Sequence, residues 1–166
     1  MRRFTLIQDF SVEPDEHWRL FLDDEVERRM FLEGFRFPKY ELLERRETDD
    51  EIVRKIRVVP RLDVPGAVAK LLGNSFGYTE VHNFDKKTKV FRAKTIPSVL
   101  ADRLSSESTV RVEPAGPGNC RRTVDVSVEA RIFGIGGLVE TALEKNLRNG
   151  WVDSAAYLAS EALKKR

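Results

Sequence analysis

The amino-acid sequence predicts an α+β protein in which helices pack on one face of an antiparallel β-sheet. Several stretches alternate apolar and polar residues with a period of two, and short polar turns join them, as in antiparallel hairpins. The 28 residues from Gly136 to Leu163 instead carry the three- and four-residue spacing of one long amphipathic helix. Strands and helices do not alternate regularly, which argues against a parallel α/β sheet.

The chain is expected to begin with a strand and two short helices. Arg3–Phe10 has the alternating pattern of a half-buried strand. Pro14, followed by acidic residues, is typical of the first turn of a helix. Asp23-Asp24 indicates a break, after which a second short helix is expected to end near Gly34.

The middle of the chain is expected to form strands with one helix between them. The expected strands are Tyr40–Glu47, Glu51–Val59, Tyr78–Phe84, Val90–Ile96, Thr109–Glu113 and Arg122–Ile132. A short helix is predicted within Leu62–Phe76, where Pro65 suits its first turn and Gly73 its end. Pro97–Ser106 fits a helical turn or an irregular strand equally well.

The strand Arg122–Ile132 has the clearest pattern, because one of its faces is apolar throughout and the other is polar. Such a strand belongs to a sheet with one side in water. The long helix from Gly136, with acidic and basic residues such as Glu140 and Arg148 expected on its outer side, would cover the other side. At about 1.5 Å per residue it would span roughly 42 Å.

Three glycines, Gly134, Gly136 and Gly137, precede this helix. They are not a Walker-type phosphate loop, because Leu138 and Val139 stand where lysine and a hydroxyl residue would be needed. A dinucleotide-binding unit would need a further strand after the helix, and none follows. The glycines are therefore interpreted as a hinge for a sharp strand-to-helix turn with close packing.

Composition limits the class of protein. The 166 residues are 41% hydrophobic and 34% charged, which fits one domain over residues 1–166 with a core of its own. The longest apolar run has eight residues, Ile132 to Val139, against the roughly 20 of a membrane span. No signal peptide is evident. Cys120 is the lone cysteine, which suits a cytoplasmic location, and its arginine neighbours could lower its thiol pKa.

Charge is distributed unevenly along the chain. Residues 1–53 hold 9 basic and 15 acidic residues, whereas residues 54–131 hold 15 basic and 8 acidic ones. The basic part could make transient contact with an anionic membrane, or it could simply form solvated strand faces. Nucleic acid is not an expected partner, because no aromatic residues are interleaved with these charges as stacking platforms.

The order of elements resembles the START-like helix-grip (SRPBCC) superfamily, which includes the Bet v 1 allergens and polyketide cyclases. More narrowly, the chain is similar to the bacterial "domain of unknown function 2505" family. The stretches that carry the resemblance are FSVEPDEHWRLFLDDEVERRMFLEGF, FGYTEVHNFD and VDVSVEARIFGIGGLVETALEKNL. The resemblance implies a curved sheet of six or seven strands around the C-terminal helix. It also implies that a lipid, sterol or other hydrophobic small molecule binds between them, and it supplies no catalytic residues.

Geometry independently favours a cavity. A helix is only about 10–12 Å wide, whereas six or seven strands at about 4.8 Å spacing make a sheet roughly 30 Å across. One helix cannot fill the concave side of a sheet that curls around it, so an apolar pocket is expected unless bulky side chains occupy it. The expected lining residues are Tyr78, Phe91, Val126, Val128, Ala130, Leu143, Leu147 and Trp151.

Gly150 interrupts the predicted helix, at a cost of about 1 kcal/mol relative to alanine. It marks either a close contact with the sheet or a point of flexibility. We hypothesise that it lets the end of the helix, with Trp151, swing as a gate for the ligand.

Tyr78, Glu80 and His82 form the one constellation with chemical potential, because steps of two place them on one face of a strand. If that face points inward, a carboxylate and an imidazole would lie about 7 Å apart in an apolar pocket, where acid–base chemistry becomes possible. They could equally orient a hydroxyl group of the ligand.

No metal or cofactor is expected. His17, next to Trp18 in a polar helical turn, is expected on the surface. The spacing of histidine and cysteine residues matches no metal site, and no nucleophile motif is present.

Three functions remain open at this point. The first is a binding or transfer protein for a hydrophobic molecule, in a variant of which the Leu71-Leu72 segment docks the pocket mouth on a membrane. The second is a small cyclase or dehydratase that uses an acid–base pair in the cavity. The third is a protein-interaction module whose cavity is filled by its own side chains.

Overall fold

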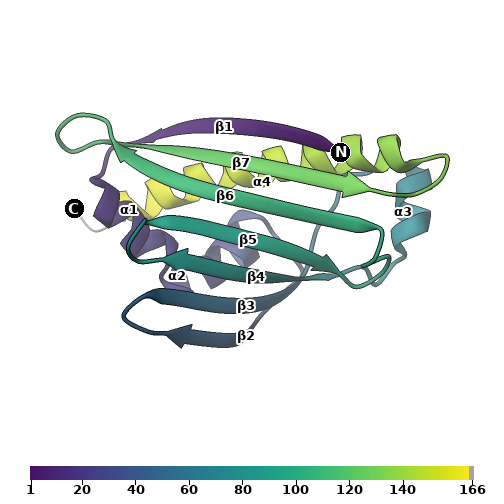
Figure 1. Cartoon of the computed structure of the whole chain (residues 1–166), viewed down its shortest axis with the longest axis horizontal. Helices are drawn as coiled ribbons and strands as arrows, with labels where there is room; N and C mark the ends of the chain where they lie inside the picture. Colours follow the sequence, from purple (N-terminus) through teal and green to yellow (C-terminus); the bar gives the residue numbers. More distant parts are fainter. Residues whose placement is uncertain (165–166) are drawn as a thin grey trace.

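The computed structural model describes residues 1–164 and shows a curved β-sheet that wraps over a long C-terminal helix (Figure 1). The elements, in chain order, are β1 (Arg2–Phe10), α1 (Pro14–Phe21), α2 (Asp24–Arg29), the π-helical turn η1 (Met30–Gly34), β2 (Lys39–Glu47), β3 (Glu51–Val59), α3 (Gly66–Leu72), β4 (Tyr78–Asp85), β5 (Val90–Pro97), β6 (Leu104–Pro114), β7 (Cys120–Ala130) and α4 (Gly136–Lys164). The predicted α+β class and the order of elements are confirmed.

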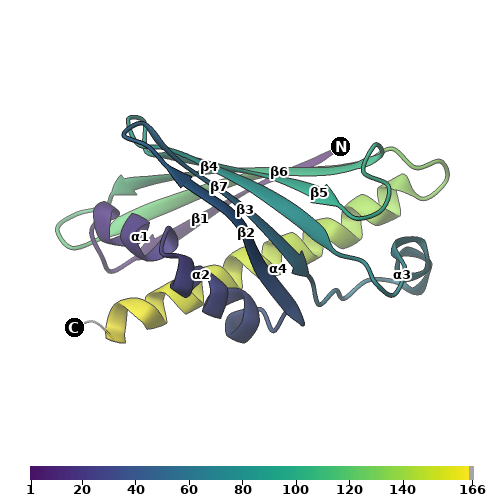
Figure 2. The ribbon, with the colours of Figure 1, turned by 90° about the horizontal axis from the view of Figure 1, so that it is seen from below.

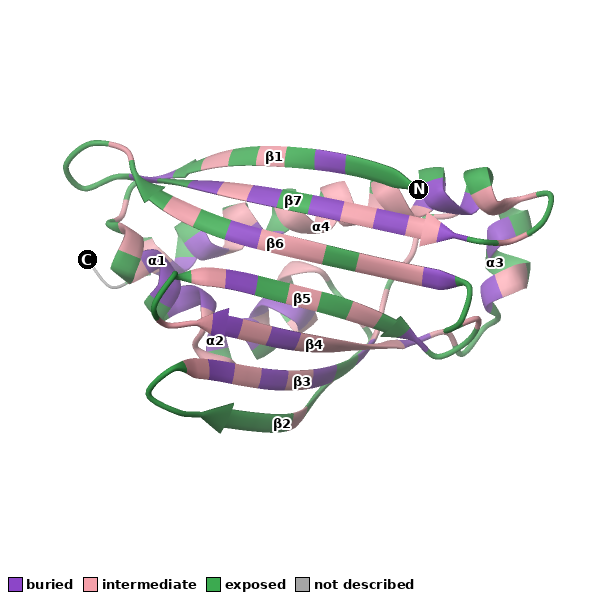
Figure 3. Cartoon of the chain, viewed as in Figure 1, coloured by how far each residue is buried: buried purple, intermediate pink, exposed green. Residues whose placement is uncertain are grey.

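Within the described residues, the sheet has seven strands in the order β1-β7-β6-β5-β4-β3-β2, and all neighbours are antiparallel. The first strand therefore lies beside the last. Figure 2 shows that α4 crosses the concave face diagonally, with α1 and α2 near its C-terminal end and α3 near its N-terminal end. Buried and less buried residues alternate along β7, as its sequence pattern predicts (Figure 3).

Two boundaries differ from the expectation. The ambiguous segment Pro97–Ser106 is neither a helix nor one strand: β5 extends through Pro97, a turn follows, and β6 begins at Leu104. β7 begins at Cys120 rather than at Arg122, because these residues pair in register with the end of β1. Cys120 is therefore buried, and burial raises the pKa of its thiol despite the charge of Arg122.

The glycines before α4 form the predicted hinge. A Cβ at Gly136 would lie 2.5 Å from the backbone oxygen of Ala130, so only glycine allows this close approach of helix and strand. Gly134 has a φ of +83°, in the left-handed region that glycine adopts without strain. Gly137, in contrast, has open space where a side chain would lie.

The hydrophobic core consists of two clusters, one under each end of α4. The larger cluster packs α1, α2 and the C-terminal part of α4 on the sheet, and the smaller packs α3 and the N-terminal part of α4 on the ends of β6 and β7. Buried residues of α4 occur only near its two ends: Val139, Glu140, Ala142, Ser154, Leu158 and Glu161. None of residues 143–153 is buried, so the middle of the helix is less closely packed than its ends.

At the N-terminal end of α4, a buried carboxylate ties the helix to the sheet. Glu140, expected on the outer face, is instead buried; it lies 3.0 Å from the amino group of Met1 and accepts a hydrogen bond from the backbone N–H of Ala130. The strand-to-helix turn brings Glu140 back over β7, which the helical pattern alone does not reveal.

At the C-terminal end of α4, a buried guanidinium has the corresponding role. Arg122 donates to Gln8 Oε1 from Nε at 2.9 Å and from Nη2 at 2.6 Å, and it contacts Ser154 Oγ at 3.4 Å. Gln8 in turn donates to the backbone oxygen of Trp151 at 2.9 Å. The rings of Phe10, Phe21 and Trp151 lie within 5.0–5.8 Å of the guanidinium carbon. None of the acidic side chains in residues 1–164 forms an ion pair with Arg122, so hydrogen bonds and aromatic faces stabilise its charge.

His17 belongs to this buried region, and its predicted surface position is wrong. Its ring is 1% exposed, stacks with Phe21, and places Nε2 3.5 Å from Arg122 Nη1. Burial, and secondarily the charge of Arg122, lower the pKa of His17 to about 3. The turn of α1 that looks polar in the sequence points inward because α1 packs against the end of the sheet.

A first prediction concerns the hinge. Gly136→Ala should lower the free energy of unfolding by roughly 1–3 kcal/mol, because the added methyl group meets backbone that cannot move aside. Gly137→Ala is the matched control and should be neutral or slightly stabilising, since its methyl group meets no atom. Urea unfolding of both variants measures the difference. Equal stabilities would contradict the close contact.

A second prediction concerns pH. The unfolded chain protonates His17 below about pH 6.5, whereas the folded protein does so only near pH 3. The stabilising contribution is therefore complete above pH 6.5 and is lost as the pH falls toward 3, at up to about 1.4 kcal/mol per pH unit. In urea titrations between pH 6 and pH 4, His17→Asn should show a shallower decline than the unmodified protein. Parallel stability–pH profiles would show that His17 is not the group responsible.

Candidate functional site

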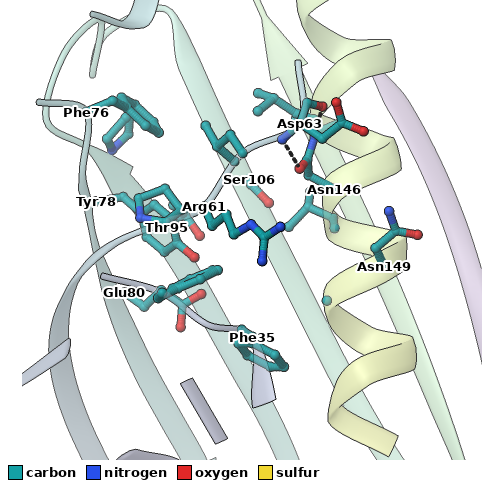
Figure 4. A pocket seen from close by; sticks show the side chains of 18 of the residues that line it. Phe35, Arg61, Asp63, Phe76, Tyr78, Glu80, Thr95, Ser106, Asn146 and Asn149 are labelled. Carbon is teal, nitrogen blue, oxygen red and sulfur yellow. Dashed lines mark hydrogen bonds between the residues drawn. The ribbon is translucent and has the colours of Figure 1, made fainter. Parts of the chain in front are cut away.

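A cavity of about 600 Å³ lies between the middle of α4 and the concave face of the sheet (Figure 4). Its position follows from the core, because it occupies the gap between the two clusters that support the ends of α4. Aromatic rings form one wall, α4 forms the opposite wall, and the segment between β3 and α3 forms the mouth. The residues that line the cavity include Phe35, Phe37, Arg61, Asp63, Phe76, Tyr78, Glu80, Thr95, Ser106, Asn146 and Asn149.

The cavity continues into a smaller inner lobe of about 110 Å³. Tyr78, Glu80, Leu147 and Gly150 are among the residues that line both lobes, so the two adjoin. The inner lobe reaches the large core cluster beneath α1 and α2. Part of the inner lobe is lined by residues that do not line the outer cavity.

The structure brings nine of ten candidate residues to this site, namely seven of the eight expected lining residues together with Glu80 and His82. Tyr78, Glu80 and Leu147 line both lobes. Val128 and Leu143 line the outer cavity, whereas the inner lobe is lined by His82, Phe91, Val126 and Trp151.

Ala130 is the exception, and its placement corrects the expectation. It lies in the smaller core cluster beneath the N-terminal part of α4, where the helix approaches β7 most closely. The alternation along β7 correctly predicted that its side chain points inward. It could not show that the cavity ends before this residue.

The aromatic wall comes from two segments that are distant in sequence. Phe35 and Phe37 follow η1, and their ring centroids are 5.5 Å apart. Tyr78, at the start of β4, lies 6.5 Å from both Phe37 and Phe76. Burial, and secondarily Glu80, raise the pKa of Tyr78, so its hydroxyl stays protonated at neutral pH. Such a wall suits a flat apolar body, because aromatic faces favour offset or edge contacts with other rings.

The floor of the cavity carries a row of polar side chains. Strand register places Glu80 beside Thr95 and Thr95 beside Ser106, so the three cross β4, β5 and β6 in one line. The sequence analysis missed Thr95 and Ser106, because each lies in a strand whose two faces are both partly polar. Only the pairing of the strands shows that they share the face of Glu80.

Glu80 and His82 are joined more tightly than predicted. Glu80 Oε2 lies 2.8 Å from His82 Nε2, whereas a separation of about 7 Å was expected. The expected separation was the distance between the Cβ atoms of alternate residues on one face of a strand, but both side chains bend toward each other. A carboxylate in contact with an imidazole can exchange a proton with it, which is the basic requirement of acid–base chemistry.

A buried network extends from His82 to Glu27, which also lines the inner lobe. Glu27 Oε1 lies 3.5 Å from His82 Nδ1 and 3.2 Å from Arg54 Nη2, and Tyr40 donates to Glu27 Oε2 at 2.7 Å. Burial, and secondarily the Glu27 carboxylate, raise the pKa of Tyr40 and keep it a donor. The sequence analysis did not single out Glu27 or Arg54. Glu27 and Arg54 are buried because α2 packs over β3 and β4, and no local sequence pattern predicts this packing.

Gly150 faces the cavity. A Cβ at this position would meet no atom within 4 Å, so close contact with the sheet is not the reason for the glycine. The flexible-gate hypothesis is the alternative that remains.

The mouth is held on one side by contacts between the β3–α3 segment and α4. Asn146 accepts a hydrogen bond from the backbone N–H of Asp63 at 3.0 Å and donates to its backbone oxygen at 2.8 Å. Leu71 and Leu72, expected at the mouth, do not line it; Leu72 is buried in the smaller core cluster and Leu71 packs against that cluster.

Across residues 1–164, no group of three His, Cys, Asp or Glu side chains is arranged to hold a metal ion. The helices in the same part of the chain include none with the length and hydrophobicity needed to cross a membrane.

The curved sheet and the long C-terminal helix that it wraps define a START-like helix-grip fold. Solved structures of this fold superpose over almost the whole chain. The Zhui aromatase/cyclase from Streptomyces sp. R1128 has a TM-score of 0.68 at 16% identity and covers 99% of this chain and 94% of its own. A START superfamily protein from Mycobacterium smegmatis has a TM-score of 0.63 at 13% identity, with 99% of each chain covered.

Norcoclaurine synthase from Thalictrum flavum, in complex with dopamine and hydroxybenzaldehyde, has a TM-score of 0.67 at 14% identity and covers 99% of this chain and 88% of its own. At these identities the likeness establishes the fold. The sequence itself matches the model of the DUF2505 family, described as proteins of unknown function, over residues 5–160, so the chain belongs to that family. Among curated proteins, none matches the sequence significantly.

Proposed function

We propose that this protein binds a hydrophobic small molecule, such as a lipid or a sterol, in the cavity between the sheet and α4. The observation that carries the proposal is the gap of about 600 Å³ between two separately packed core clusters. This volume lies within the roughly 300–1,000 Å³ typical of ligand pockets. A protein-interaction module with a filled interior is not favoured, because the interior is not filled.

The lining supports an apolar ligand with a few polar atoms. Rings on one wall and leucines on the other would bury apolar surface at about 25 cal/mol per Å², or roughly 2.5 kcal/mol for each 100 Å². The polar row of Glu80, Thr95 and Ser106 offers hydrogen bonds on one edge only. Such an arrangement fixes the orientation of a ligand that carries hydroxyl or carbonyl groups on one side.

Two further parts of the proposal concern the location of the protein and its contact with membranes. A cytoplasmic location is supported by the lone, buried Cys120. Transient contact with an anionic membrane is supported by the net positive charge of residues 54–131. The Leu71-Leu72 segment does not contribute an exposed apolar anchor to such a contact.

The Glu80–His82 contact favours a second candidate function, a small enzyme of the cyclase or dehydratase type. The pair lies in the wall of the inner lobe, with the Tyr78 hydroxyl on the same face of β4. In this candidate Glu80 would remove a proton from a bound substrate, and His82 would orient the carboxylate. Nothing but side chains of this chain would be needed.

The binding proposal can be tested at Gly150. Titration with the neutral fluorophore N-phenyl-1-naphthylamine should show saturable binding to the unmodified protein. Gly150→Phe should weaken binding at least tenfold, because the ring would occupy the space shared by both lobes. Gly150→Ala removes the same flexibility with little added volume and should bind within about twofold.

Each outcome of this titration has a distinct meaning. Absence of binding to the unmodified protein, or unchanged binding to Gly150→Phe, would contradict the proposed pocket. Loss of binding already in Gly150→Ala would show that flexibility of α4, and not space, controls entry. Unchanged on- and off-rates in Gly150→Ala would eliminate the gate hypothesis.

The enzymatic candidate can be tested without knowing the substrate. In 5-nitrobenzisoxazole, removal of one ring proton by a base breaks the N–O bond and releases a coloured phenolate. A positioned Glu80 should accelerate this reaction, and Glu80→Gln should lose at least tenfold in rate, in the range that general-base catalysis supplies. Glu44→Gln, an exposed carboxylate on β2, is the control. Equal rates for all three proteins would exclude Glu80 as a base.

A further inference from the structure

Arg61 is an exposed cation at the mouth of the cavity, and its side chain has no partner within the described residues. It follows β3 at the mouth, and Figure 4 shows its side chain extended into the pocket. Within the described residues, its guanidinium forms neither a hydrogen bond nor an ion pair. A guanidinium presents five donors in a planar fork that fits a carboxylate in bidentate geometry. An unengaged fork at the mouth of an apolar cavity therefore marks a place for an anionic group.

The acidic residues of the cavity do not neutralise Arg61. Asp63 Oδ2 lies 2.8 Å from Lys145 Nζ, and this ion pair lowers the pKa of Asp63. Glu80 is engaged by His82 at 2.8 Å. Asp153, on α4, lies exposed and forms no ion pair with Arg61 in this part of the chain. The backbone of Asp63 is hydrogen-bonded to Asn146 on α4. These hydrogen bonds hold the β3–α3 segment in place and keep Arg61 at the mouth.

The cavity combines three kinds of surface. Arg61 contributes a cation, the aromatic wall includes Phe37 and Tyr78, and Thr95 and Ser106 contribute hydroxyl groups. A ligand with an apolar body and an acid at one end would satisfy all three. A purely apolar ligand would make no use of the guanidinium, whereas an acid would add a charge-assisted contact.

We infer that the ligand is a hydrophobic carboxylic acid with an aromatic or polycyclic body, whose carboxylate binds Arg61 at the mouth of the cavity. This inference rests on the proposed binding function and deepens it by naming the class of ligand. The body packs between the aromatic wall and the leucines of α4. The carboxylate stays near solvent, so the interaction weakens as salt is added.

Three fluorescent probes with the same body and different ends test the inference: 1-pyrenebutanoic acid, 1-pyrenebutanol and 1-pyrenebutylamine. At pH 7.5 and low salt, the acid should bind the unmodified protein at least tenfold more tightly than the alcohol, as expected of a charge-assisted contact. Arg61→Met should reduce that ratio below threefold and leave the alcohol unaffected. Arg61→Lys should give an intermediate ratio, because an ammonium lacks the planar fork.

Lys94→Met is the matched control. Lys94 is an exposed cation on β5 that lies next to Thr95 and therefore on the opposite face of the strand. Its removal changes the net charge by the same amount as Arg61→Met, and the preference for the acid should stay at its original value. A preference lost equally in both variants would assign it to overall charge and overturn the inference.

The remaining outcomes separate this inference from the proposed function. If the unmodified protein binds none of the probes, the proposed function fails and the inference with it. If the alcohol binds as tightly as the acid, the proposed function stands and the inference fails. Tighter binding of the amine would assign selection to Asp153 instead. Equal weakening of all probes by Arg61→Met would give Arg61 a structural role only, which also overturns the inference.

Discussion

The structure depends on how α4 is anchored near its two ends, where its buried residues lie. Near its N-terminal end, α4 touches the sheet at Gly136 so closely that no side chain fits between helix and strand. Near its C-terminal end, Trp151 and Ser154 rest on Arg122 and its partner Gln8. Between these supports the curved sheet falls away from a straight helix, and the cavity occupies the gap. The cavity is therefore a consequence of how the helix is anchored.

Both supports use buried polar groups, although apolar packing would cost less. A guanidinium buried without a carboxylate carries a large desolvation penalty. Arg122 offsets it with two bonds to Gln8 and with three aromatic faces, each worth up to about 2 kcal/mol when desolvated. Leucines in its place could pack in several ways. Hydrogen bonds and ring faces have fixed directions, so they set the position of α4 along the sheet and with it the shape of the cavity.

Local periodicity was sufficient for the α+β class and for the direction of most side chains, and the family resemblance supplied the curved sheet around the C-terminal helix. The pattern of β7 placed Val126 and Val128 inward, and two-residue steps placed Glu80 and His82 on one face. Periodicity cannot report how neighbouring strands align or what packs over them. The shared row of Glu80, Thr95 and Ser106 needs the strand register. The burial of His17 needs the packing of α1 against Arg122.

The distribution of buried residues along α4 also bears on stability and binding. Residues 143–153 of α4 are all at least partly exposed, and the buried residues of the helix lie outside this range. Substitutions at exposed positions that line the cavity, such as Asn149, and in the segment that carries Arg61 can change the cavity without removing the contacts of Trp151 with Gln8 and Arg122. A fold arranged in this way can keep its framework while its ligand changes. The low identity between this chain and solved structures that share its framework is consistent with that freedom.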